Sequence, residues 1–216
     1  MTAVAAGFAE PVLAAQATFR VVMDALARPG TIGRLAGVSA PAPLSRTAAA
    51  IALTLLDYET SFWLDAPLAD TGEVARFISF HTGARITADP ADAAFAFVAA
   101  PASAPPFAQF AQGTLEYPDR STTLVLQVAR LAENDGMVLR GPGIAGMRRL
   151  AAAPLPADFV AQLADNRARF PRGVDILLAA ADAVAGLPRS LQLVSRFRSS
   201  PEFAARSEAN FGIEGH

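Results

Sequence analysis

The sequence predicts one α/β domain over residues 1–194, in which helices cover both faces of a mixed sheet. In the first half, segments with helical periodicity alternate with short apolar runs typical of buried strands. In the second half, two β-branched and aliphatic runs flank a turn signal, which predicts a hairpin. The chain of 216 residues is 52% hydrophobic and 18% charged, and this composition suits a well-buried core.

The first predicted helix spans residues 11–27 and has proline at its first turn. One apolar stripe recurs at helical spacing through Phe19, Val22, Met23 and Leu26. Pro29 pushes Arg28 out of the α region, and Gly30 then permits the chain to reverse. Arg28 therefore stands where a helix ends. Its guanidinium either interacts with the carboxyl end of its own helix or binds an external carboxylate or phosphate.

The remaining elements follow from capping residues and apolar runs. Ser45 is predicted to cap a second helix, and Gly83 to close a third. Asn134-Asp135-Gly136 is the predicted hairpin turn. The predicted helices cover residues 46–57, 74–81, 107–112 and 156–169, and the predicted extended segments and strands cover 31–35, 61–64, 94–99, 121–131, 137–140, 174–180 and 190–194. Residues 195–216 are polar and are expected to form a partly disordered tail.

Missing residue types exclude several functions. The chain has no Cys, which excludes a thiolate nucleophile and disulfides, and no Lys, which excludes a Walker A loop and a covalently held pyridoxal phosphate of the usual kind. Its histidines are His81 and His216, too few for a metal site with several imidazoles. The net charge of −2 gives no general attraction for nucleic acid. No apolar run reaches membrane-spanning length, and the N-terminus lacks the basic region of a signal peptide, so we expect a cytoplasmic protein without membrane association.

Several residues are candidates for chemistry, each with a structural alternative. His81 lies near a helix end, where a lone histidine is commonly a cap. Arg167 and Arg172 lie close together in the sequence, where proline and glycine end a predicted helix. Clustered arginines suit phosphate, and the alternative is that they are simply solvated at a helix end. Asp175 lies inside an apolar strand and needs a partner if buried, for which arginine is the obvious choice. No Ser-His-Asp set or carboxylate pair can be defended, so the residues alone define no reaction.

Six segments occur in the order found in a known family. They are FRVVMDALARPGT (19–31), LLDYETSFWL (55–64), FHTGA (80–84), Gly113-Thr114 with Pro118 and STTLVLQV (121–128), LRGPGI (139–144), and NRARFPRGVDILL (166–178) with Leu187-Pro188-Arg189. No single segment is specific, but the ordered set over about residues 11–194 resembles the PhnH family, a subunit of the bacterial carbon–phosphorus lyase system. The tail beyond Val194 departs from the family's pattern.

This resemblance implies a three-layer α/β/α sandwich similar to the large domain of pyridoxal-phosphate-dependent aminotransferases, without that cofactor. It implies a homodimer that joins the other subunits of a core complex. With them, the system displaces adenine from ATP by a phosphonate and gives ribose 1-phosphonate 5-triphosphate, before a radical lyase breaks the carbon–phosphorus bond. The competing class is a stand-alone phosphate-ester or nucleotide-binding enzyme that uses its arginine cluster.

The resemblance supplies no catalytic residue. The positions that match its segments and are candidates for binding are Arg28, His81, Arg167, Asp175 and Arg189. The positions expected to shape turns are Pro29, Gly30, Gly141, Gly143, Pro171 and Gly173. No metal site is expected. No resident cofactor is expected either, because the chain has no lysine for pyridoxal phosphate, and ATP and the phosphonate are substrates of the complex.

Overall fold

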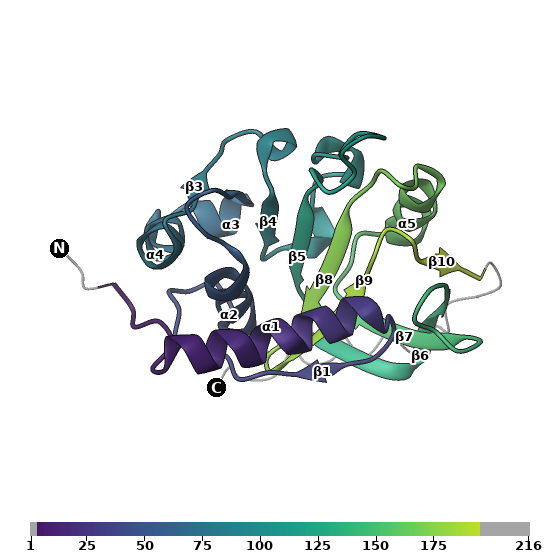
Figure 1. Cartoon of the computed structure of the whole chain (residues 1–216), viewed down its shortest axis with the longest axis horizontal. Coiled ribbons are helices and arrows are strands. Elements are labelled where there is room, and N and C mark those ends of the chain that lie inside the picture. The colour runs from purple at the N-terminus through teal and green to yellow at the C-terminus, as the bar shows by residue number, and fades with distance from the viewer. Residues whose placement is uncertain (1–3, 195–216) are drawn as a thin grey trace, which may run out of the picture.

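A seven-stranded mixed sheet and a smaller three-stranded sheet organise the chain in a computed structural model, which describes residues 4–194 (Figure 1). The large sheet has the order β1-β9-β8-β5-β4-β2-β3. Its parallel strands are β3 (Arg85–Ile86), β2 (Ser61–Leu64), β4 (Phe95–Val98), β5 (Thr123–Gln127) and β8 (Asp175–Ala179). β9 (Ala183–Leu187) runs antiparallel to β8, and β1 (Gly33–Arg34) runs antiparallel to β9. The predicted α/β class with a mixed sheet is confirmed.

The inner strands of the large sheet serve two hydrophobic cores, because successive side chains point to opposite faces. On one face, Phe62, Phe97 and Val125 pack with residues of α1 (Pro11–Ala27), α2 (Arg46–Leu55), α3 (Ala66–Ala69) and α4 (Glu73–Thr82). On the other face, Leu124 and Ile176 pack with α5 (Phe159–Ala168) and with residues of the smaller sheet. Helices therefore lie against both faces, as the sequence predicted.

The helix α1 has the predicted bounds but not the predicted buried face. Thr18, Val22 and Ala25 are its buried residues. Phe19 and Met23 belong to the predicted stripe, yet they are 47% and 38% exposed. The difference arises because α1 packs on β9 and α2, a contact that buries only a narrow side of the helix.

Two predicted helix-end signals are confirmed. The hydroxyl of Ser45 accepts a hydrogen bond from the backbone N–H of Ala48 at 3.1 Å and so caps α2. Gly83 adopts the left-handed conformation and closes α4. Other bounds differ: α2 ends at Leu55, and the helix predicted over residues 107–112 is one 3-10 turn, η3 (Phe107–Gln109). The further 3-10 turns are η1 (Pro90–Asp92) and η2 (Pro101–Ser103).

The predicted hairpin between residues 121–131 and 137–140 is wrong. β5 ends at Gln127, and a separate strand β6 (Arg130–Arg140) runs through the supposed turn and pairs with β7 (Arg148–Ala153) and β10 (Gln192–Leu193). Glu133 and Met137 both pair with Leu150, so residues 134–136 form a bulge. Asn134 and Gly136 have φ of 64° and 72°. A bulge uses the same positive φ as a tight turn, which explains the wrong prediction.

Sequence reasoning also missed β7 and β9. β9 reads AVAGL, and alanine and glycine have low β propensity. The strand predicted over residues 190–194 contains only the short β10, and it belongs to the smaller sheet. The predicted tail, 195–216, lies outside the described residues. Among the helices within residues 4–194, none is both long enough and apolar enough to cross a membrane.

Candidate functional site

The candidate residues do not converge on one centre. The structure brings Asp175 and Arg189 together at the beginning of β8, whereas Arg28, His81 and Arg167 contact other parts of the fold. Each position therefore has its own set of contacts.

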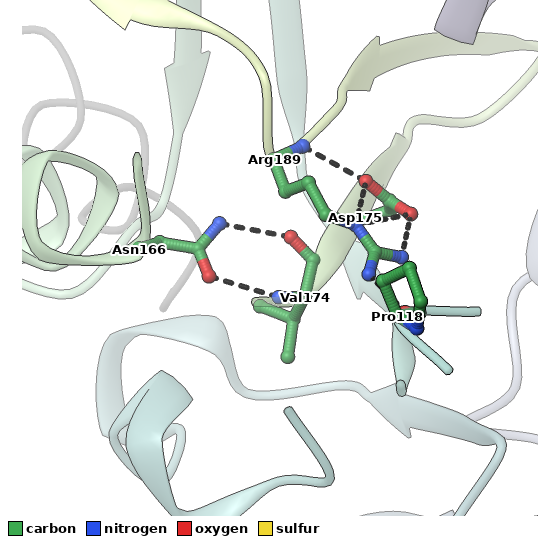
Figure 2. Close-up of polar contacts among 5 residues, drawn as sticks. All are labelled: Pro118, Asn166, Val174, Asp175 and Arg189. Carbon is green, nitrogen blue, oxygen red and sulfur yellow. Dashed lines mark hydrogen bonds and ion pairs between the residues drawn. The ribbon is translucent and has the colours of Figure 1, made fainter. Parts of the chain in front are cut away.

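Asp175 and Arg189 form a half-buried ion pair (Figure 2). Nη2 of Arg189 lies 2.5 Å from Oδ2 of Asp175, and the backbone N–H of Arg189 donates to Oδ1 at 2.8 Å. Nη1 of Arg189 also donates to the carbonyl of Pro118 at 2.5 Å. Only 22% of the Asp175 side chain and 15% of the Arg189 side chain are exposed. These contacts join the start of β8, the end of β9 and the loop before β5, and arginine is the partner that the sequence predicted for Asp175.

Asn166 fixes the chain on the other side of Asp175. Its side-chain amide donates to the carbonyl of Val174 at 2.9 Å and accepts from the N–H of Val174 at 2.8 Å (Figure 2). Sequence reasoning did not select Asn166. The available signal was its place at i, i+4 and i+7 with Phe159 and Leu163, on the buried face of α5. We name the set Pro118, Asn166, Val174, Asp175 and Arg189 the bracket.

Arg167 takes no part in the bracket's ion pair and lies over an aromatic ring. Its guanidinium carbon is 4.8 Å from the centre of the Phe170 ring. Its Nε is buried and has no hydrogen-bond partner within residues 4–194. Arg169 instead donates to Gln112 at 3.3 Å. The predicted arginine cluster is therefore divided among different partners.

His81 holds the N-terminal segment against α4. Its Nε2 lies 2.9 Å from the carbonyl oxygen of Ala5, so this nitrogen carries the donated proton. The ring packs edge-on against Phe77 and Phe80, with centroid distances of 4.8 and 5.1 Å. A carbonyl and two aromatic rings position a histidine but do not activate it as a base. This geometry favours the structural alternative for His81.

Arg28 pairs with Asp24 one turn earlier on α1, and both side chains are mostly exposed. Hydrogen bonding to Arg28 lowers the pKa of Asp24 below its usual value. The same bond raises the pKa of Arg28. The guanidinium thus serves its own helix end in this structure, while the backbone that follows it makes a longer-range contact.

That backbone contact joins the turn at Pro29-Gly30 to the turn at residues 141–143. A Cβ atom built on Gly143 would lie 1.8 Å from the carbonyl oxygen of Ala27 and 3.2 Å from Cδ of Pro29. Only glycine permits the end of α1 to approach the loop between β6 and β7 so closely. The predicted turn glycines Gly30, Gly141, Gly143 and Gly173 have φ of 84°, 146°, 79° and 127°, and Pro171 follows a cis peptide bond. We name the contact between residues 27–30 and 141–143 the junction.

A polar pocket of about 300 Å³ opens beside the junction. Glu133 at its wall is held in place, because its Oε1 accepts from the backbone N–H of Ile32 at 2.8 Å. The pocket is lined by Gly30, Glu133, Asn134, Ala145, Met147, Arg148 and Arg149. We name it the junction pocket. It was not predicted, because its arginines lie on β7, a strand that sequence reasoning missed.

Asp65 lies where a doubly wound sheet commonly holds its ligand, at the carboxyl ends of β2 and β4, between which the strand order reverses. It follows β2, and its carboxylate accepts from the N–H groups of Ala99 and Ala100, just beyond β4, at 2.8 and 2.9 Å. Burial raises the pKa of Asp65, while these hydrogen bonds oppose the shift. The carboxylate therefore occupies the backbone N–H donors after β4 and also caps the N-terminus of α3. Its missed sequence signal was D-A-P-L, an N-cap followed by proline.

One family of known proteins matches almost all of the described chain. Its model, described as "Bacterial phosphonate metabolism protein (PhnH)", matches residues 6–194. The chain belongs to the PhnH family. This bears out the resemblance inferred from the ordered segments.

Two relatives extend the PhnH assignment. "Alpha-D-ribose 1-methylphosphonate 5-triphosphate synthase subunit PhnH" of Rhizobium meliloti (strain 1021) is 48% identical over 187 residues, which are 86% of this chain and 93% of that protein. A Stutzerimonas stutzeri protein with the provisional name C-P lyase subunit protein HtxG is 35% identical over 81 residues, 38% of this chain and 42% of that protein. The bracket and the junction both lie inside the PhnH match.

Proposed function

We propose that this chain is a subunit of an α-D-ribose 1-methylphosphonate 5-triphosphate synthase in bacterial phosphonate catabolism. The observation that carries the proposal is 48% identity to a protein of that name over 93% of its length. In this role the chain supports the formation of ribose 1-phosphonate 5-triphosphate from ATP and an alkylphosphonate. It acts in the cytoplasm with the other subunits of the carbon–phosphorus lyase complex.

We assign the chain a non-catalytic or co-catalytic part in that reaction. The contacts of the candidate residues support this assignment: Asp175 and Arg189 neutralise each other, and His81 faces a carbonyl and aromatic rings. The absence of Cys and Lys from the sequence removes two common nucleophiles.

Reconstitution tests the proposal. The full chain is incubated with ATP and methylphosphonate, with and without the partner subunits, and adenine release is measured. We expect release only from the complex, and we expect omission of this chain to abolish it or reduce it strongly. Unchanged release without this chain would overturn the subunit role, and release by this chain alone would overturn the non-catalytic part.

One observation favours the second candidate, a stand-alone phosphate-ester or nucleotide-binding enzyme. The Arg167 guanidinium lies over Phe170, and within residues 4–194 no carboxylate pairs with it. Such a cation is available to a phosphate. Turnover of ATP or a phosphate ester by the purified chain, lost in Arg167→Gln, would establish this alternative.

We further propose that the fold is similar to the large domain of pyridoxal-phosphate-dependent aminotransferases and that the chain does not use the cofactor. The seven-stranded mixed sheet between two cores supports the similarity. The sequence contains no lysine for an internal aldimine. Added pyridoxal phosphate is expected to give no Schiff-base absorbance, and a borohydride-trapped adduct on a side chain would contradict this.

We also propose a homodimer, with other surfaces reserved for the partner subunits. The support is the apolar surface of α1, where Val12, Leu13 and Phe19 are exposed. Light scattering of the full chain at micromolar concentration is expected to give the mass of two chains. A monomer mass would remove the dimer from the proposal.

A further inference from the structure

The junction pocket is built from three segments that are distant in the sequence. Gly30 comes from the turn after α1, Glu133 and Asn134 from the bulge of β6, and Arg148 and Arg149 from the start of β7. One of these segments, the turn after α1, also contacts Gly143 at the junction. Through Gly30 the pocket reaches one of the segments that carry the family resemblance, residues 19–31.

The backbone around the pocket is specialised. Within residues 4–194, Asn134 is the one non-glycine residue with a positive φ, 64°. This backbone conformation costs energy in most residues and clusters at functional sites. It begins the bulge that removes residues 134–136 from the β6–β7 ladder. Bulges of this kind redirect side chains beside binding sites. On the opposite wall, a Cβ on Gly30 would lie only 3.0 Å from Cβ of Arg148, so glycine lets that arginine stand directly over the turn.

The charges of the lining favour an anion. The charged residues of the lining are Arg148, Arg149 and Glu133, which together carry a net positive charge, and Oε1 of Glu133 accepts from the N–H of Ile32. Asn134 adds a side-chain amide. Planar guanidiniums bind phosphate groups through paired hydrogen bonds, and a hollow with several polar groups fixes the ligand's orientation.

We propose that the junction pocket binds a phosphorus oxyanion, either the triphosphate or the phosphonate group of the substrates or product. This inference rests on the proposed function, because that function supplies ligands of this chemistry. Arg148, whose side chain packs against the turn at Gly30, holds the oxygens, and the charge of Arg149 adds to the attraction. The site would orient a substrate for chemistry carried out with the partner subunits.

Titration calorimetry on the full chain tests the site directly. The probes are tripolyphosphate, ATP, methylphosphonate and sulfate, at one low ionic strength. We expect at least one phosphorus oxyanion to bind more tightly than sulfate, and Arg148→Gln to weaken it about tenfold or more, as loss of a charge-assisted contact does. Arg20→Gln is the matched control: it removes an equal charge from the exposed surface of α1, outside the pocket, and should leave the affinity unchanged.

The probes also separate the two sources of the ligand. Binding of tripolyphosphate and ATP assigns the triphosphate, binding of methylphosphonate alone assigns the phosphonate, and binding of all three supports a shared oxyanion site. The proposal is overturned if no phosphorus oxyanion binds, if sulfate binds equally well, or if Arg148→Gln has no effect. Because this readout needs no partner subunit, the pocket can fail while adenine release by the complex persists, and the reverse can also occur.

Discussion

The bracket and the junction lie in segments that resemble the same family, yet they are stabilised in opposite ways. In the bracket, side chains satisfy one another: Asp175 neutralises Arg189, and Asn166 completes the backbone bonding of Val174. In the junction, backbone meets backbone at Gly143 and Ala27, and the polar junction pocket lies beside this contact. The comparison teaches that segments distant in the sequence are joined by paired polar side chains at one place and by close backbone packing at another.

The largest effect is expected from Gly143→Ala, which tests whether the junction depends on close approach. The new Cβ would lie 1.8 Å from the carbonyl oxygen of Ala27, so the end of α1 must move. We expect roughly 3 kcal/mol or more of lost stability in urea unfolding. Gly146→Ala is the matched control, because Gly146 has a similar φ of 82° but a Cβ added there would have nothing within 4 Å, and it should lose only about 1–2 kcal/mol. Equal losses would mean that backbone strain, not the contact, explains Gly143.

Asn166→Ala breaks the buried half of the bracket. It leaves both the N–H and the carbonyl of Val174 without their partner in a buried position. Each unsatisfied group costs about 1–3 kcal/mol, so we expect at least roughly 2 kcal/mol of lost stability, measured by chemical unfolding. A loss no larger than that of an exposed surface substitution would show that water replaces the amide.

Asp175→Asn tests the charged half of the bracket at nearly constant shape. The Arg189 guanidinium would keep its place without a neutralising charge, at a cost of about 1–3 kcal/mol, below that of a fully buried pair. The control is Asp182→Asn, which removes an exposed ion pair with Arg34 and should cost about 0–1 kcal/mol. Thermal unfolding of both variants checks the difference, and similar shifts would contradict a structural role for the bracket's ion pair.

Within the described residues, Asp65 is a buried carboxylate without a cationic partner, unlike Asp175 in the bracket, and this difference should appear in how stability depends on pH. Burial raises its folded-state pKa above the ordinary value of 3.8, so the folded chain binds the proton more tightly than the unfolded chain. Stability should therefore fall as pH rises from 3.8 through the raised folded-state pKa. Asp65→Asn removes this dependence, so the melting temperature of the wild type should decline relative to the variant over that window. Parallel pH profiles would contradict the burial argument.

The smallest effect is expected from Arg28→Ala, which separates the junction's backbone from the side chain beside it. The Arg28 guanidinium pairs with the exposed Asp24, so its removal should change the melting temperature little. Adenine release by the reconstituted complex should persist. A strong loss of release with an unchanged melting temperature would return Arg28 to the binding site, and Arg28→Lys would then test whether the planar fork is required.

Local patterns predicted much of the first half. The bounds of α1, the Ser45 cap and the closing glycine of α4 depend on residues a few positions apart, and those signals were read correctly. The same local reasoning failed at Asn134-Asp135-Gly136, because positive φ serves a bulge as well as a turn. β6 belongs to the smaller sheet because it pairs with β7 and β10, and no local signal specifies that pairing.

The sequence by itself determined the α/β class, the helix caps and, through the order of its segments, membership in the PhnH family. It also named Arg189 and Asp175 separately. Only the tertiary structure joined them, packed Gly143 onto Ala27, and brought Glu133 to Ile32 across 101 positions of chain. The physical reason is range: helix periodicity and capping act within one or two turns, whereas ion pairs and pockets require the whole fold to bring distant residues within a few ångströms.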